Sequence, residues 1–363
     1  MECLSCSKPV EIFYSINKPV TVSSDVRPVS KSIDLYKCNN CQLIQKRTNK
    51  QYLDDVSKIY ESYFAQSLAQ GGDELLQSGD VSYTRSELIL RSVQKYIGTK
   101  KKHIDIGCGS GVFLSASVSK GFDSYAQDIS SNHQKKISGL VGENRFYVGG
   151  IDVIDQKFEV VSLIHVLEHI PDFNAFFENL KSIMEKDAVL IIQVPYSLEN
   201  LYDLFVYDHI SHFSYTSLHS LLQKYFKYIN LSENAVYKEI TAVVSDSPIE
   251  KAHVPEDAVF DRELLDEFMG LSDGGGEEIS ILGSGPSALV AAQLLDGRFS
   301  HFIDEDTRKQ GSTLFGKSIK ADAGASEVIL PYPRKQAESI ASRLKNINVY
   351  YPKLERSHYE RNR

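Results

Sequence analysis

Three glycines at alternate positions follow an acid and a short apolar run, where a strand pattern gives way to a helix pattern. They are Gly107, Gly109 and Gly111, and Asp105 stands two residues before the first of them. Glycine is used where a backbone takes positive φ or lets a ligand approach closely, and the start of a helix presents unpaired N–H groups. P-loops and dinucleotide-binding folds carry similar turns, but here the spacing is GxGxG and no Lys-Ser/Thr pair follows. The stretch predicts a turn that binds a polar ligand.

Four of the five cysteines lie within the first 41 residues, as two pairs that each enclose two residues. Thiolates at this spacing can meet in one tetrahedral Zn²⁺ site that is closed by four protein ligands. Disulfides are the alternative, and a cytoplasmic location disfavours them. We therefore expect a structural zinc ion in a small lobe with β-hairpins between the pairs. Its ligands would be Cys3, Cys6, Cys38 and Cys41.

A loop rich in histidines, acids and aromatic residues follows an expected strand over residues 188–194. In an α/β sheet, ligands bind at the carboxyl ends of the strands. His209 is the best candidate general base, because imidazole titrates near neutral pH and Asp208 or Tyr207 could orient it. Tyr207 and His212 are candidate proton relays or hydroxyl contacts. The alternative is a polar loop packed against a helix.

Composition limits the class of protein. At 363 residues the chain is long for one core, so two or three domains are expected. The net charge of −8 leaves no electrostatic footprint for nucleic acid, and the longest apolar stretches are only strand-sized. The N-terminus lacks the basic and apolar regions of a signal peptide. We expect a cytoplasmic protein with a small-molecule substrate and neither nucleic-acid nor membrane partners.

Beyond residue 100 the chain alternates strand and helix patterns, after a helical, tyrosine-rich connector and a periodic helix near residues 86–96. Such alternation predicts a mostly parallel sheet with helices on both faces. The strands are expected near 102–106, 123–127, 145–148, 159–165 and 188–194.

A second glycine turn contains Gly283 and Gly285, and Asp304 follows at the end of another expected strand. The GxGxxA spacing with a later acid predicts a second α/β domain of Rossmann type. Pro286 removes one N–H group from the turn, which weakens a phosphate-binding role. Both nucleotide binding and a purely architectural role are open for this turn.

The stretch IDIGCGSGVFL resembles motif I of the class I S-adenosylmethionine (SAM) methyltransferases. The resemblance implies that Asp105 and the three glycines hold the amino-acid end of SAM, and that Asp128 accepts the ribose hydroxyls. After the fourth strand the sequence reads HVLEH, in which Glu stands in the wrong position for the zinc-protease motif HExxH. The segment instead resembles the one that borders the methionine end of SAM, which implies a cofactor contact for His165. A structural role for His165 is the alternative.

Four segments in one order resemble the three-domain sugar C-methyltransferases that act on nucleotide-linked 4-keto deoxysugars. They are the cysteine pairs with LYKCNNCQLIQ, the motif IDIGCGSGVFL, the loop VPYSLENLYDLFVYDHISHFSYTSL and the late FIDEDTRKQGSTLFGKSI. The resemblance implies a zinc lobe, a SAM domain and a C-terminal Rossmann-like domain. It also implies that a His base removes the proton beside the ketone and that the enolate attacks the SAM methyl group. Tyr60 and Tyr63 resemble tyrosines that reach the sugar, and packing is their alternative role.

The candidate active loop departs from the family pattern, which reads roughly HEHLSYFS. His209 aligns with the second His, Asp208 shortens the Glu, Tyr207 replaces the first His, and His212 stands where the family has Tyr. These changes lie where the substrate would bind, whereas the cofactor and zinc motifs are intact. Methyl transfer is therefore better supported than the identity of the substrate.

Together these patterns predict an α/β protein with a class I SAM methyltransferase (Rossmann-like) central domain. Residues 1–70 would form the zinc lobe and connector, 71–250 the SAM-binding domain and 251–363 the C-terminal Rossmann-like domain. The predicted enzyme methylates a nucleotide-activated 4-keto deoxysugar at carbon. The alternatives are an O-methyltransferase acting on a sugar or other small molecule, a dinucleotide-binding redox protein, and an interaction module with a degenerate SAM fold.

Overall fold

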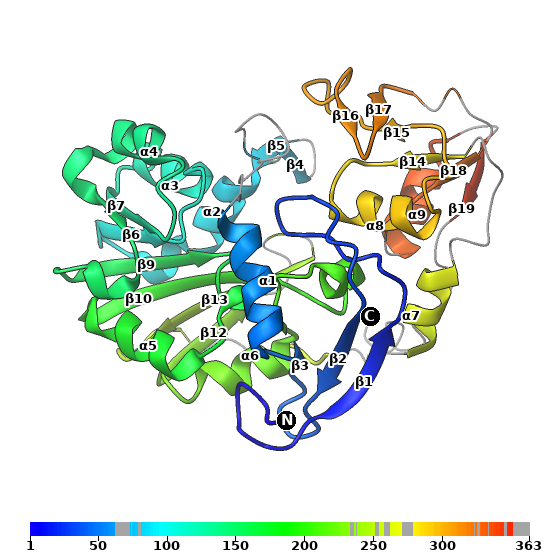
Figure 1. Cartoon of the computed structure of the whole chain (residues 1–363). Helices are drawn as coiled ribbons and strands as arrows, with labels where there is room; N and C mark the ends of the chain where they lie inside the picture. The colour runs from blue at the N-terminus through cyan, green and yellow to red at the C-terminus, as the bar shows by residue number, and fades with distance from the viewer. Residues whose placement is uncertain are drawn as a thin grey trace.

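The computed structural model describes residues 1–61, 73, 75–78, 81–232, 236, 238–250, 254–257, 262–270, 279–322, 324, 327–332, 334–344 and 347–350. Within these ranges the strands form three larger sheets and one two-stranded hairpin, β4 (Leu75–Ser78) with β5 (Val81–Thr84). In Figure 1 the seven-stranded sheet lies on the left, the N-terminal strands lie at the lower right and the C-terminal sheet lies at the upper right.

The seven-stranded sheet has the order β12-β13-β10-β9-β6-β7-β8. The strands β8, β7, β6, β9 and β10 run parallel, whereas β13 is antiparallel to both of its neighbours. Because the chain moves outward from β6 in one direction and then from β9 in the other, the switch point lies between these two strands. The five expected strands and the Rossmann-like class I arrangement are confirmed. Their bounds are β6 Lys102–Ile106, β7 Asp123–Asp128, β8 Phe146–Val148, β9 Phe158–Ile164, β10 Met184–Pro195, β12 Tyr228–Ser232 and β13 Glu239–Ser245.

Helices cover both faces of this sheet. Along β10, Val189 and Ile191 share a buried cluster with residues of α2, whereas Leu190 and Ile192 share another with residues of α5 and α6. Alternate residues of a strand point to opposite faces, so an apolar run such as this one is buried on both sides. The helices are α1 Lys50–Glu61, α2 Arg85–Ile97, α3 Val112–Ser119, α4 Gln134–Val141, α5 Phe173–Ser182, α6 Tyr215–Leu222, α7 Arg262–Met269, α8 Pro286–Leu294 and α9 Arg334–Ala341.

The N-terminal sheet is antiparallel, with the order β1-β2-β3-β11. Its last strand does not come from the N-terminal lobe, because β11 follows β10 by more than ten residues and pairs through Ser211 with Gln45 and through His212 with Ile44. The candidate active loop therefore completes the sheet of the lobe that carries the cysteines. The strands are β1 Glu11–Ile16, β2 Ile33–Lys37, β3 Ile44–Lys46 and β11 Ser211–His212.

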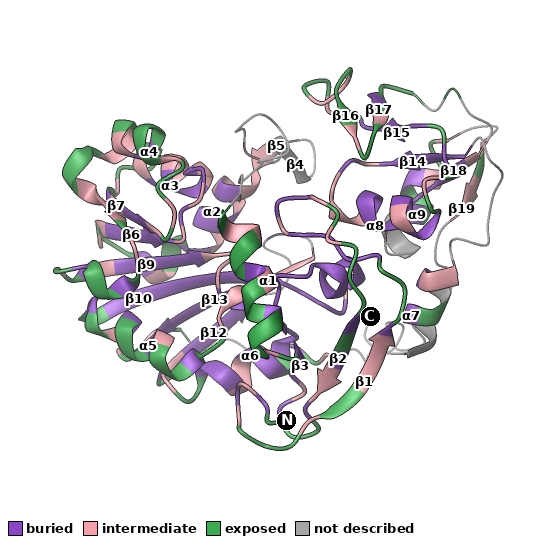
Figure 2. Cartoon of the chain, in the orientation of Figure 1, coloured by how far each residue is buried: buried purple, intermediate pink, exposed green. Residues whose placement is uncertain are grey.

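The C-terminal sheet has the order β16-β17-β15-β14-β18-β19; β16 and β17 pair antiparallel, and the other neighbouring strands pair parallel. Helix α8 is buried along most of its length (Figure 2). Its alanines pack on the C-terminal strands, whereas Leu289, Val290 and Leu294 join a cluster with the N-terminal lobe. The strands are β14 Ser280–Leu282, β15 Phe302–Ile303, β16 Thr313–Leu314, β17 Lys317–Lys320, β18 Glu327–Ile329 and β19 Asn348–Tyr350.

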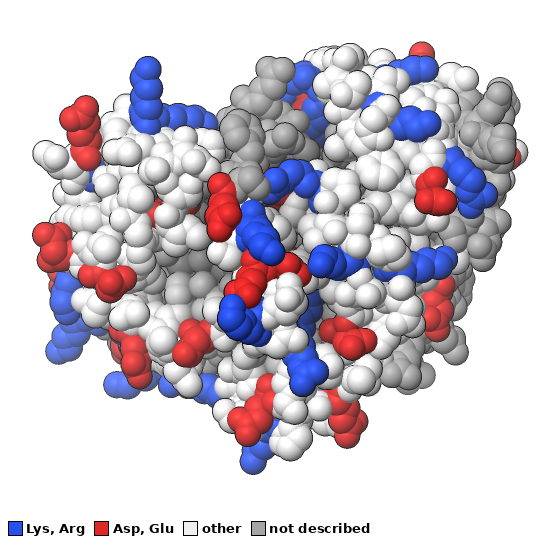
Figure 3. All heavy atoms as spheres, in the orientation of Figure 1, with Lys and Arg blue, Asp and Glu red and all other residues white. Residues whose placement is uncertain are grey.

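Both signs of charge are interspersed on the face shown in Figure 3. Along α1, for example, Lys50 pairs with Asp54 at 2.7 Å and Lys58 lies 3.7 Å from Asp55. None of the helices in the described ranges has both the length and the apolar character needed to cross a bilayer.

Candidate active site

The glycine turn after β6 is left-handed at all three glycines. Gly107, Gly109 and Gly111 have φ of 67°, 51° and 77°. A Cβ atom at Gly107 would lie 2.6 Å from Cγ2 of Val166, and one at Gly111 would lie 2.5 Å from Cδ1 of Ile137. Glycine is therefore needed here for its conformation and for space. The turn leads directly into α3 and forms a cradle at the carboxyl edge of the sheet.

Two carboxylates support this cradle. Asp105 is buried and accepts a hydrogen bond of 2.6 Å from the Ser162 hydroxyl, and burial raises the pKa of Asp105 to about 7. Asp128 ends β7, where Oδ2 accepts the Gly109 N–H at 2.8 Å and Oδ1 accepts the Ser130 N–H at 2.9 Å. Because each carboxylate oxygen has more than one acceptor position, Asp128 can still accept hydroxyl groups of a ligand. The structure thus brings these predicted residues to one edge.

His165 follows β9 and is engaged within the protein. Its Nδ1 lies 3.0 Å from Glu168 Oε1 and its Nε2 lies 3.0 Å from Glu239 Oε1, while Arg85 contacts both His165 and Glu239. Burial lowers the pKa of His165, but the Glu239 carboxylate outweighs it and the result is about 9. Both ring nitrogens already have partners, which favours the structural role for this side chain. Arg85 and Glu239 were not anticipated from the sequence.

The histidine loop is organised around Asp203, in the short helical turn η4 (Leu201–Phe205). Asp203 Oδ1 lies 2.5 Å from His209 Nδ1, and Asp203 Oδ2 lies 2.6 Å from His212 Nδ1. All three side chains are buried. One carboxylate therefore orients two imidazoles through their Nδ1 atoms, which leaves Nε2 of His209 as the atom that could take a proton.

The surroundings shift the pKa values of His209 and His212 in opposite directions. Burial lowers the pKa of His209, but the carboxylate of Asp203, with Glu168 and Asp208, outweighs burial and holds it above its ordinary value. Burial and the nearby Lys46 ammonium lower the pKa of His212 to about 4, so His212 is neutral. Burial raises the pKa of Asp203, yet both imidazoles outweigh this and hold it far below its ordinary value. The pKa of His209 is thus raised and that of His212 lowered, so His209 is the imidazole of this group that binds a proton more readily.

The expected partners of His209 are corrected by the structure. Asp208 bonds elsewhere, because it accepts the Ser24 N–H at 2.8 Å and the Ser24 hydroxyl at 2.5 Å. The Tyr207 hydroxyl donates to Asp55 at 3.3 Å. Asp208 therefore acts on His209 through its charge rather than by a hydrogen bond, and Tyr207 is directed to another partner. An acid inside the apolar run LYDLFV, which needs a buried partner, was the signal that could have identified Asp203.

Beside His209 lies a polar group contributed by η3 (Leu167–His169). One donor atom each from Glu168, His169 and His209 lies within 4.8 Å of the others, close enough for one bound polar atom or cation. The rings of His169 and His209 meet edge to face at 4.7 Å, and the Tyr60 hydroxyl lies 2.9 Å from His169 Nδ1. Glu168 Oε2 is buried and accepts no hydrogen bond from the described residues. A ligand hydroxyl would satisfy this oxygen. Tyr63 lies outside the described residues.

The four N-terminal cysteines converge. Their sulfur atoms lie within 4.8 Å of one another, with Cys3 and Cys41 at 3.5 Å and Cys6 and Cys38 at 3.4 Å. A disulfide would need about 2.05 Å. Four thiolates at about 2.3 Å from a tetrahedral Zn²⁺ lie about 3.8 Å apart, so the cluster could hold such an ion.

The C-terminal glycine turn is occupied by the protein itself. The Ser284 hydroxyl donates to Asp304, and Lys309 Nζ lies 3.1 Å from the same carboxylate oxygen. A Cβ atom at Gly283 would lie 2.4 Å from the Tyr332 hydroxyl. Asp304, the later acid of the GxGxxA pattern, also accepts the Asp306 N–H at 2.9 Å. Its carboxylate thus already has three partners, which favours the architectural role.

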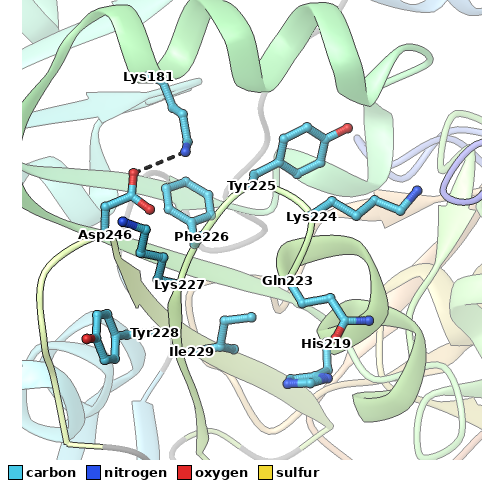
Figure 4. Close-up of a pocket in the computed structure, with 10 residues that line it drawn as sticks. All are labelled: Lys181, His219, Gln223, Lys224, Tyr225, Phe226, Lys227, Tyr228, Ile229 and Asp246. Carbon is cyan, nitrogen blue, oxygen red and sulfur yellow. Dashed lines mark hydrogen bonds and ion pairs between the residues drawn. The ribbon is translucent and has the colours of Figure 1, made fainter.

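Two cavities border the central domain. One of about 750 Å³ lies where α5 and α6 end and β12 begins, and Figure 4 shows Lys181 paired with Asp246 at its rim, 3.1 Å apart. Asp246 directly follows β13, so this cavity lies away from the carboxyl edge that carries the candidate site. The other, of about 300 Å³, is lined by Gly111 together with Glu87 and Lys136 and adjoins the glycine turn.

Comparison with known proteins assigns the central region. Residues 80–225 match a family model described as a methyltransferase domain. This region is a methyltransferase domain. Its bounds enclose the glycine turn, Asp128, His209 and Asp203.

Two curated proteins are similar to part of this chain. Ubiquinone biosynthesis O-methyltransferases from Glaesserella parasuis and Actinobacillus pleuropneumoniae are 26% and 30% identical over 104 residues. The matches cover 25% of this chain and 44% of each relative, so the chain spans less than half the length of these relatives.

Solved structures that resemble part of this chain include the N,N-8-amino-8-demethyl-D-riboflavin dimethyltransferase from Streptomyces davawensis and a proposed O-methyltransferase of Nostoc punctiforme. The first has a TM-score of 0.40 and 16% identity, covering 55% of this chain and 60% of its own. The second has a TM-score of 0.37 and 14% identity, covering 44% and 55%. Because both TM-scores are below 0.5, the fold of this chain is assigned from its strand order and from the family model instead.

A testable prediction follows from the Asp203 carboxylate, which His209 and His212 share. We expect Asp203→Asn to lower the pKa of His209 by about 1 to 3 pH units, because an opposite charge that favours the imidazolium is removed. NMR titration of the histidine side chains measures this. Asp55→Asn is the matched control, since Asp55 contacts Tyr207 on the same loop rather than a histidine. An unchanged His209 pKa in the Asp203 variant would contradict the assignment.

Proposed function

We propose that this protein transfers the methyl group of SAM to a carbon atom of a nucleotide-linked 4-keto deoxysugar, with His209 as general base. The observation that carries the proposal is the buried His209, held through Nδ1 by Asp203 on the loop that leaves β10. The glycine cradle and Asp128 lie at the carboxyl edge of the same sheet. The whole-chain order of motifs supports the sugar as the acceptor.

The cradle would hold SAM, which supplies an electrophilic methyl group on its sulfonium when bound. Asp128 would accept hydrogen bonds from the ribose hydroxyls, as the acid at the end of the second strand does in nucleotide-binding folds. The left-handed glycines would let the amino-acid end approach the backbone beside Asp105. The Cβ clashes at Gly107 and Gly111 fit this role, because the turn has no room for side chains.

His209 would remove the proton from the carbon beside the ketone. Nε2 accepts this proton, and the Asp203 carboxylate stabilises the resulting imidazolium. The developing enolate oxygen needs a nearby donor. The Tyr60 hydroxyl is a candidate, because it is bonded to His169, whose ring contacts His209. The methyl group of SAM held in the cradle would pass to the enolate carbon, its bond to the sulfonium sulfur would break, and S-adenosylhomocysteine would leave.

O-methylation is the second candidate, and the curated relatives favour it, since both are named O-methyltransferases. The same His209 would then deprotonate a hydroxyl. Glu168 Oε2, which has no hydrogen-bond partner among the described residues, could accept a hydrogen bond from a neighbouring hydroxyl of either kind of acceptor.

The cysteine cluster would hold a structural zinc ion. With four sulfur ligands it leaves no open position, so its contribution would be to fold the lobe. The spacing of the four sulfur atoms supports this role.

We expect the purified protein to hold zinc and Cys41→Ser to lose it, because the substitution removes one of four thiolate ligands. Elemental analysis by mass spectrometry measures the metal content. Cys108→Ser is the matched control, since Cys108 is also buried but lies in the glycine turn. Full zinc occupancy in the Cys41 variant would rule out the proposed ligand set.

The glycine turn after β6 can be tested through its affinity for SAM. We expect Gly107→Ala to weaken SAM binding by at least about tenfold, because a left-handed residue with a Cβ costs about 1–2 kcal/mol and clashes with Val166. Isothermal titration calorimetry measures the affinity. Gly98→Ala is the control, because Gly98 is also left-handed but a Cβ at this position would meet no atom of the described residues within 4 Å. Equal SAM affinity in the two variants would place the cofactor elsewhere.

The decisive experiment is product NMR with ¹³C-methyl SAM and a panel of nucleotide-linked 4-keto sugars. A methyl signal coupled to a ring carbon is expected, and a methoxy signal would move the chemistry to oxygen. No transfer to any member of the panel would remove the sugar assignment.

With an acceptor in hand, His209→Ala should lower the rate by about 100-fold or more, as for loss of a general base. His219→Ala, on α6 beside the distant cavity, should not. The neutral imidazole is the active form and its pKa is raised, so the wild-type rate should rise with pH through a value above 6.5. A wild-type rate in His209→Ala would exclude this base.

A further inference from the structure

The loop that carries His209 leaves the central sheet and makes many of its hydrogen bonds to the N-terminal lobe. The Tyr207 N–H donates to the Val22 carbonyl at 2.7 Å, and the Val22 N–H donates to the Phe205 carbonyl at 3.1 Å. Ser24 holds the Asp208 side chain. β3 then pairs with β11. Between the turn η4 and β11, the loop backbone is therefore hydrogen-bonded to the N-terminal lobe at several positions. It also contacts η3 of the central domain, where the Ile210 N–H donates to the Glu168 carbonyl at 2.7 Å.

One buried lysine makes the densest set of these contacts. Lys46 ends β3 and is 1% exposed. Its N–H donates to the Ile210 carbonyl at 2.8 Å, and its Nζ donates to the His209 carbonyl at 2.7 Å and to the Val206 carbonyl. Both hydrogen bonds of the ammonium thus end on the loop, at His209 itself and at Val206, three residues before it.

A buried lysine is costly, because its charge loses hydration. Burial lowers the pKa of Lys46 to about 7, although the nearby Asp203 and Asp208 carboxylates raise it. An apolar residue at the end of β3 would avoid this cost but could not bond the two carbonyls. The contacts that offset the cost all belong to the loop, which argues that holding the loop is the function of this side chain.

Strand β3 is also tied to the cysteine cluster. It begins three residues after Cys41, and the Cys38 N–H donates to the Leu43 carbonyl at 2.9 Å. The Gln45 side chain accepts the Leu4 N–H at 2.8 Å and donates to the Glu2 carbonyl at 3.2 Å. β3 therefore connects both cysteine pairs on one side with the histidine loop on the other.

We propose that Lys46 is a positioning residue for His209, through which the cysteine lobe sets the geometry of the base. The proposal rests on the proposed role of His209, but what it states physically is that Lys46 determines where the His209 ring lies. The glycine cradle should depend less on this link, because its local cluster of Cys108, Leu114, Ala126 and Ile137 contains no residue of the N-terminal lobe. The strand before the cradle does share a buried cluster with the cysteines, through Ile104 and Ile106. Loss of the Lys46 contacts should therefore lower the rate of methyl transfer while SAM binding is retained.

The test compares Lys46→Met with Lys50→Met in the full chain. Methionine keeps an unbranched stem of similar length but removes all three donors. Lys50 is exposed on α1 and pairs with Asp54 on the same helix. We expect Lys46→Met to lower kcat by about 10–100-fold, as for a misplaced reacting group, and to move the His209 side-chain NMR signals. SAM affinity and the signals of His103, which is buried in β6, should stay unchanged. Lys50→Met should change none of these.

Removing zinc from the wild-type chain with a chelator provides a second arm. It should move the same His209 signals while calorimetry still detects SAM binding. Unmoved His209 signals in both arms would overturn the proposal, and so would loss of SAM binding in Lys46→Met, since the link would then be general to the fold. If the wild-type chain methylates no acceptor but His209 moves in both arms, the proposed function fails and the positioning role stands.

Discussion

The candidate site depends on one buried carboxylate that two imidazoles share. Asp203 holds His209 and His212 through Nδ1, and its charge keeps the pKa of His209 high although burial would lower it. A buried carboxylate is costly when unpaired, so these three side chains are stable only as a set. The short turn η4 supplies Asp203 to the set, and the sheet pairing at β11 places His212 against it.

Parts of the N-terminal lobe, the central domain and the C-terminal unit pack around the loop that carries Asp203, His209 and His212. The buried cluster around the loop contains residues of the N-terminal strands, of η4, of α7 and of α8. In the centre of Figure 2 the loop is drawn as buried between these elements. The central sheet presents a cofactor cradle at its carboxyl edge, whereas the N-terminal lobe holds the histidines. Under the proposed function, cofactor binding and proton removal would therefore depend on different parts of the chain.

The C-terminal unit contributes to the same assembly by packing. Gln293, on α8, donates to the Val20 carbonyl and accepts from the Ser30 hydroxyl, both in the N-terminal lobe. Its glycine turn is closed by the contact of Ser284 with Asp304. The described contacts of α8 thus support the N-terminal segment that packs against the histidine loop.

The sequence by itself determined the central fold and the parts of the site that are local in the chain. Strand positions, the glycine turn and Asp128 follow from apolar periodicity and from glycine spacing, because these features act within one strand, one turn and one helix. The four cysteines were likewise readable, since each pair is a local motif. Only the tertiary structure decided the partners of the histidines. Lys46 from β3 and Tyr60 beside His169 depend on contacts between residues 163 and 109 positions apart. Asp203 lies only six residues from His209, but the folded loop directs its side chain, rather than that of Asp208, to the imidazole. The hydrogen bonds of buried side chains depend on which elements pack together, and the spacing of residues along the chain does not show which elements these are.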